Sequence, residues 1–92
     1  MTEVEVVAKS MFTHQYDRLR EMLVESRKAA GMTQAQVAEC LHKPQSFVSK
    51  YERGERRLDV VEFLEVAQCV GIEGAELVRR LARSRNGHAR SP

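Results

Sequence analysis

The chain has 92 residues, of which 42% are hydrophobic and 30% are charged, and its formal net charge is +2. This length suits one small domain whose core is large enough to fold alone. No apolar run approaches the roughly 20 residues that a membrane-spanning helix needs. Glu3 and Glu5 stand where a secretion signal would carry Lys or Arg. We therefore expect a cytoplasmic protein with no membrane partner.

Residues 1–12 are expected to form an ordered N-terminal arm. Val4, Val6 and Ala8 are spaced two apart, which favours a short strand. The pattern Thr-x-x-Glu at the start of the arm could equally cap a helix. A segment this apolar should bury against its own domain or against a second subunit.

A first long helix is predicted from about His14 to Ala30, with Thr13 as its N-cap and Gly31 as the left-handed residue beyond its end. One face of this helix has the i, i+3, i+4, i+7 spacing of a surface that packs on a core. The residues at that spacing are Tyr16, Leu19, Met22, Leu23 and Ser26.

Thr33 to Gly54 predicts two short helices joined by a tight turn. Thr33 and Gln36 form a capping box for the first of them, and Pro44 is expected at the first position of the second. At about 100° per residue, the second helix has one apolar arc and one polar arc. The polar arc offers amide, hydroxyl and cationic groups, which hydrogen-bond to base edges and phosphates. It is formed by Gln45, Ser46, Ser49, Lys50 and Arg53.

A polar loop with paired arginines follows, and Asp59 is the expected N-cap of a fourth helix. The buried stripe of that helix is predicted to be Phe63, Leu64, Ala67 and Val70. A fifth helix is predicted over roughly Gly74 to Ser84. Its apolar residues Leu77, Val78 and Leu81 either complete the monomer's core or form a homodimer contact. Residues 85–92 are expected to be a flexible basic tail.

Charge is segregated along the chain. Residues 43–57 are mainly basic, residues 58–74 contain acidic side chains and no Lys or Arg, and the chain is basic again from Arg79. A cationic patch on a nearly neutral protein indicates a local anionic partner.

Cys40 and Cys69 lie on separate predicted helices. A disulfide is possible, but in a reduced compartment we expect two small buried thiols. Neither cysteine belongs to a CxxC pair and the three histidines are scattered, so we expect neither a metal site nor a cofactor. An enzyme is not expected, because no nucleophile is paired with a base and no Gly-rich loop could cradle a phosphate.

The segments MTQAQVAECL, PQSFVSKYERGERR and LDVVEFLEVAQCVGI resemble the lambda repressor/Cro-type (Xre-like) helix-turn-helix family over about residues 14–81. The resemblance implies an all-α fold, a compact five-helix lambda-repressor-like DNA-binding domain at residues 13–84, beside the short N-terminal arm. It also implies an internal salt bridge between Arg27 and Glu52. The chain departs from the family pattern at Ser26, His42 and Phe47.

The resemblance also implies DNA contacts. Gln34 would contact a phosphate and support the recognition helix, and Gln45 and Ser46 would read bases. Ser49 and Lys50 would lie further along the groove on the same face. The expected phosphate contacts beyond Gln34 are Lys43, Arg53, Arg56 and Arg57.

We therefore expect a sequence-specific transcriptional regulator, preferentially a repressor, that binds a palindromic operator of double-stranded DNA as a homodimer. Its recognition helix, residues 44–53, would lie in the major groove. One alternative is an antitoxin or controller subunit that regulates its own operon with a protein partner. An alternative of another class is a helical protein-interaction module that has lost DNA binding. No small-molecule substrate is expected.

Overall fold

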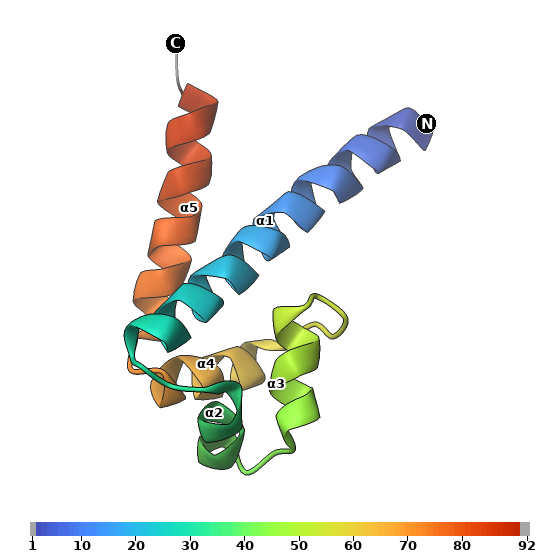
Figure 1. Cartoon of the computed structure of the whole chain (residues 1–92). Helices are drawn as coiled ribbons and strands as arrows, with labels where there is room; N and C mark the ends of the chain where they lie inside the picture. The colour runs from blue at the N-terminus through green and yellow to red at the C-terminus, as the bar shows by residue number, and fades with distance from the viewer. Residues whose placement is uncertain (1, 91–92) are drawn as a thin grey trace.

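The computed structural model describes the backbone of residues 2–90 and the side chains of residues 14–83. This part of the chain forms five helices and no strand, which confirms the all-α prediction. The helices are α1 (Thr2–Ala29), α2 (Gln34–Leu41), α3 (Gln45–Glu52), α4 (Val60–Cys69) and α5 (Gly74–Arg90). The end of α1 meets the start of α5, the two helices diverge from that junction, and α2, α3 and α4 gather on its other side (Figure 1).

Helix α1 begins much earlier than the sequence predicted. It is continuous from Thr2, so the strand prediction for the arm is wrong, and Thr13 lies inside the helix instead of capping it. The strand prediction was based on only three apolar residues at a spacing of two, which is a short pattern. Extending an existing helix needs no new nucleus, so the helical alternative prevails. The prediction that the arm's apolar side chains are buried concerns side chains that lie outside the described part of the chain.

Helix α5 also continues further than predicted. Its backbone is helical to Arg90, where a flexible tail was expected beyond Ser84. The same argument about helix propagation applies here. The division of the chain into arm, domain and tail stays a prediction.

Local capping explains where the short helices begin. The Thr33 hydroxyl accepts from the Gln36 N–H at 3.1 Å, and the Gln36 side chain accepts from the Thr33 N–H at 2.9 Å. Asp59 and Glu62 form the same reciprocal pair at the start of α4, at 2.7 and 3.0 Å. Both capping predictions are confirmed. Pro44 is the N-cap of α3 and not its first helical residue.

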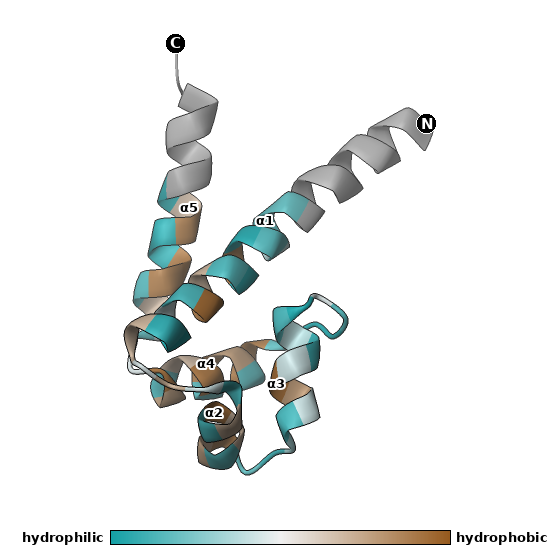
Figure 2. Cartoon of the chain, in the orientation of Figure 1, coloured by the Kyte–Doolittle hydropathy of each residue, from teal (hydrophilic) through white to brown (hydrophobic). Residues whose placement is uncertain are grey.

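One hydrophobic core joins all five helices. Figure 2 shows hydrophobic positions concentrated on α2 and α4 and a hydrophilic loop after α3. The buried cluster consists of Met22, Leu23, Val37, Ala38, Val48, Tyr51, Phe63, Val66, Val70 and Leu77. Leu64, which was predicted to be buried, is 48% exposed, and Val60, Val61 and Val78 are also exposed. The predicted stripe is confirmed at Phe63, Ala67 and Val70 and wrong at Leu64, and Val66 is a buried residue that the prediction missed.

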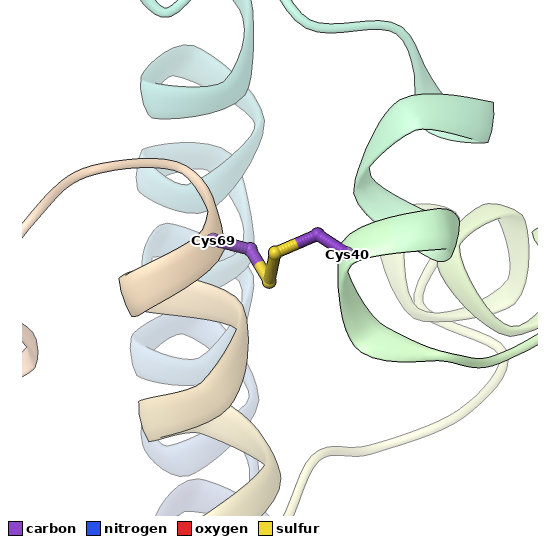
Figure 3. The surroundings of a disulfide bond; sticks show 2 residues. All are labelled: Cys40 and Cys69. Atoms are coloured by element: carbon purple, nitrogen blue, oxygen red, sulfur yellow. A yellow bond between two sulfur atoms is a disulfide. The ribbon is translucent and has the colours of Figure 1, made fainter.

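Cys40 and Cys69 form a disulfide between α2 and α4 (Figure 3). The expectation of two buried thiols is wrong in both respects, because Cys40 is exposed and Cys69 is partly exposed. The sequence argument depended on the usual redox state of one compartment. It contained no information on distance, and the fold brings the two Cα atoms to 6.0 Å.

Candidate DNA-binding interface

The turn between α2 and α3 sets the angle between these two helices. His42 has a left-handed backbone with φ 59°, a conformation that few residues other than glycine adopt. Its N–H donates to the Glu39 carbonyl at 3.1 Å, and the Lys43 N–H donates to the Ala38 carbonyl at 3.0 Å. These bonds end α2 and turn the chain into α3.

Helix α3 presents one buried face and one open face. Val48, Tyr51 and Glu52 are buried against the domain. On the other side, Ser49 is partly exposed and the other predicted DNA-facing residues of this helix are exposed. These exposed residues are Gln45, Ser46, Lys50 and Arg53.

Glu52 anchors the end of α3 to α1. Its carboxylate, 7% exposed, accepts from the Arg27 Nε at 2.7 Å and from the Arg27 Nη2 at 3.1 Å. The Gln34 amide donates to the same carboxylate at 2.8 Å. A buried charge is tolerated when such bonds satisfy it. The predicted salt bridge is confirmed, and Glu52 belongs to the framework beneath the site.

Two glutamines, Gln34 and Gln45, connect the buried Glu52 carboxylate to the protein surface. A carboxylate only accepts, so the Gln34 amide nitrogen faces Glu52 and its oxygen faces outward. That oxygen accepts from the Gln45 Nε2 at 3.4 Å. The Gln45 carbonyl and its second N–H remain on the exposed side of α3. An acceptor and a donor side by side match the N6 and N7 edge of adenine.

Arg20 is a residue that the sequence reasoning missed. Its guanidinium donates to the Glu52 carbonyl at the end of α3 and to the Asp17 carboxylate at 3.4 Å. It therefore ties the last turn of α3 to α1. A signal was present, because Arg20 and Arg27 lie two turns apart on one face of α1.

Arg53 and Ser49 contact each other and a neighbouring carboxylate. The Arg53 guanidinium donates to both Glu55 oxygens at 3.0 Å and to the Ser49 hydroxyl. These bonds from Arg53 lower the pKa of the Glu55 carboxyl. A phosphate at this position would compete with Glu55 for Arg53.

The two arginines of the loop have partners within the chain. Arg56 donates to both Glu62 oxygens at 2.9 Å and lies 4.7 Å from the centre of the Phe47 ring. Lys43 lies over the same ring at 5.1 Å. The hydrogen bond from Arg56, and next the bond from the Asp59 backbone, lower the pKa of the Glu62 carboxyl to about 2.

Arg57 lies over the Tyr16 ring at 4.3 Å. The Tyr16 hydroxyl in turn accepts from the Leu58 N–H at 3.1 Å. Cation–π contacts of this kind hold a guanidinium in place without removing its charge. Phe47, Tyr16 and Glu62 thus position the basic loop, and the sequence assigned none of them to that task.

The predicted contact residues come from the start of α2, the turn, α3 and the following loop. No metal cluster of three or more His, Cys, Asp or Glu occurs in the described region. Within the same region, no helix is long and apolar enough to cross a membrane.

This arrangement of α2, turn and α3 defines a helix-turn-helix domain. The helix-turn-helix family model matches residues 23–77. A solved structure of an "XRE-family like protein from Pseudomonas syringae pv. tomato str. DC3000" is 41% identical, with a TM-score of 0.84. The match covers 85% of this chain and 95% of that one. No curated protein matches. The chain belongs to the Xre-like helix-turn-helix family of DNA-binding transcription regulators.

Proposed function

We propose that this protein is a sequence-specific regulator that binds a palindromic operator as a homodimer, with α3 in the major groove. The observation that carries the proposal is the Arg27–Glu52–Gln34–Gln45 chain of hydrogen bonds. Its last bond, from Gln45 to Gln34 at 3.4 Å, favours one direction of the exposed Gln45 amide before DNA arrives. A pre-oriented group loses less conformational entropy on binding than a free one.

The proposed contacts divide into two classes. Gln45 and Ser46 read base edges near the start of α3, and Ser49 and Lys50 lie further along the groove. The proposed phosphate contacts are the backbone N–H of Gln34 at the start of α2 and the side chains of Lys43, Arg53, Arg56 and Arg57. Because Arg53 and Arg56 are paired with carboxylates, phosphate must displace Glu55 and Glu62 or share these arginines with them.

Exposed apolar side chains support the homodimer. Val60, Val61 and Leu64 on α4 and Val78 on α5 are 73, 64, 48 and 50% exposed. A second copy would remove such surface from water. Two recognition helices also read enough base pairs for useful specificity, which one helix does not. In the antitoxin alternative a second protein would bind the arm or the tail, and the side chains of both lie outside the described part of the chain.

We further propose that the protein acts in the cytoplasm as a repressor, by occupying an operator that overlaps a promoter and excluding polymerase. Selection of bound sequences from a random DNA pool at about 150 mM salt tests the DNA-binding proposal, because salt sets the non-specific background. A palindromic consensus with half-sites about 34 Å apart, or a multiple of this, is the expected result. Enrichment of no sequence would contradict the proposal.

A further inference from the structure

The disulfide between Cys40 and Cys69 has no part in the function proposed above. The bond joins Cys40, near the end of α2, to Cys69, the last residue of α4 (Figure 3). The ring that it closes contains the whole of α3. We propose that this disulfide is a thiol–disulfide exchange site, opened in the folded protein by a low-molecular-weight thiol or a dithiol protein, and that its opening weakens DNA binding. The second part rests on the proposed function.

The disulfide lies at the surface. Cys40 is exposed and Cys69 is partly exposed. Both line a surface hollow whose other walls are Leu41, His42, Glu65 and Gln68. Exchange requires a thiolate to reach a disulfide sulfur, and reactivity follows access. A reagent can approach this bond without unfolding the domain.

The proposed function also determines the redox environment. A regulator shares a compartment with DNA, and reductants in that compartment keep most thiols reduced. Disulfides formed there are usually transient. The Cα separation of 6.0 Å is within the usual range for a disulfide, and the packing of α2 on α4 keeps the two cysteines near each other. The pair can therefore close under oxidising conditions and reopen afterwards.

Opening the bond leaves the packing between α2 and α4 in place. Val37 and Ala38 of α2 and Val66 and Ala67 of α4 are 0–4% exposed. Three of them, Val37, Ala38 and Val66, belong to the main core cluster. Reduction removes a covalent tether beside this packed interface and does not remove the interface itself. We expect the reduced protein to stay folded with lower stability.

The exchange takes two steps. A thiolate attacks the Cys40 sulfur, forms a mixed disulfide and releases the Cys69 thiolate, which takes up a proton. A second thiol then attacks the reagent sulfur of the mixed disulfide, which frees Cys40 and leaves the two reagent thiols joined. The protein disulfide gains two electrons and two protons, and the reagent thiols lose them.

The tether affects the DNA-facing surface through α2. That helix carries Gln34 at its start and leads through His42 into α3 at its end. With the tether open, α2 is held against α4 by packing alone. If α2 takes up a wider range of positions, a smaller fraction of the molecules has the Gln34–Gln45 arrangement in place. The apparent affinity for DNA falls with that fraction.

The first test needs no DNA. The full chain is equilibrated without denaturant in glutathione buffers from oxidising to reducing. Free thiols are trapped with N-ethylmaleimide and counted by intact mass, and circular dichroism is recorded in parallel. We expect two adducts under reducing conditions with the helical signal retained, and melting about 10 °C or more below that of the oxidised form. Adducts that appear only when the protein unfolds would overturn the proposal.

The double variant Cys40→Ser/Cys69→Ser is the control. It should melt with the reduced wild type and should not respond to reductant. If the variant does not fold, the adduct count on the wild type still decides the question. If the reduced wild type loses its helical signal, the disulfide is needed to keep the protein folded, and the proposal of an exchange site is overturned.

The second test measures fluorescence anisotropy on the selected operator. We expect reduction to weaken binding about 3–10-fold and reoxidation to restore it, with no effect of reductant on the double variant. Equal affinity in both redox states would overturn control of DNA binding by the disulfide. If neither state binds any DNA, the proposed function fails, and the result of the first test stands independently.

Discussion

Glu52 connects the core of the domain to its proposed DNA-facing surface. It is 8% exposed, it lies at the end of α3, and it accepts hydrogen bonds from Arg27 and Gln34. Arg20 holds the backbone carbonyl of the same residue. One residue therefore fixes the end of α3 and, through Gln34, the amide of Gln45.

Replacing Arg27 with Met should destabilise the protein by about 3 kcal/mol, because the Glu52 carboxylate would stay buried without its cation. Urea unfolding followed by circular dichroism measures the change. Arg18→Met is the matched control, since Arg18 forms only exposed pairs with Glu21 and Glu25 and should cost less than about 0.5 kcal/mol. An equal loss of unfolding free energy in the two variants would show that the buried Arg27–Glu52 pair stabilises the protein no more than an exposed pair does.

The Glu62 carboxyl should make stability depend on pH. Its pKa is lowered from 4.5 to about 2 in the folded protein. The unfolded chain therefore binds more protons between these values. The stabilisation is present above pH 4.5 and is lost as the pH falls towards 2. Urea midpoints across this range should fall less steeply in Arg56→Ala, and an unchanged slope would contradict this assignment.

Sequence reasoning identified the Arg27–Glu52 pair through the family resemblance, but it missed the Arg56–Glu62 pair. Glu62 lies in the first turn of α4, where its carboxylate accepts from the Asp59 N–H at 3.0 Å. The loop geometry lets the same carboxylate accept from Arg56 as well. Side-chain partners across a loop depend on its three-dimensional course, which residue spacing does not determine.

At the scale of elements, the ends of α3 matter as much as its exposed face. Gly54 follows the C-cap of this helix with φ 81°. An added Cβ there would lie 3.3 Å from the Arg20 Nε. Gly54 thus supplies a left-handed turn and also makes room for the arginine that holds the last turn of α3.

Gly54→Ala should destabilise the protein by about 1–2 kcal/mol, because a left-handed alanine is strained and its Cβ crowds Arg20. Gly71→Ala is the matched control, since Gly71 has φ 80° and nothing within 4 Å of an added Cβ. Thermal unfolding should show the larger loss for Gly54→Ala. A larger loss for Gly71→Ala would contradict the role given to Arg20.

The sequence predicted the middle of the fold well and its ends poorly. Thr33, Asp59 and the left-handed Gly31 are local signals, and each has its expected role. The extents of α1 and α5 depend on helix propagation, which has no sharp local signal in residues 2–13 or 85–90. The disulfide depends on a distance between helices, which no local pattern encodes.

At the scale of the whole molecule, the exposed apolar side chains of α4 and α5 are expected to form the homodimer contact. Val61→Asp should shift sedimentation equilibrium towards monomer and weaken operator binding, because it places a charge in an apolar contact. Val61 is 64% exposed, so the melting temperature should hardly change. An unchanged sedimentation profile would place the dimer contact elsewhere.

Gln45 provides the most direct test of the central claim that α3 reads DNA sequence. Binding of the full chain is measured on the selected operator and on random DNA, for the wild type, Gln45→Ala and Gln68→Ala. Gln68 is an exposed glutamine of α4 outside the proposed interface. Gln45→Ala should lose about 1–3 kcal/mol on the operator and almost nothing on random DNA, while Gln68→Ala changes neither. Equal losses on both DNAs for Gln45→Ala would contradict base reading by α3.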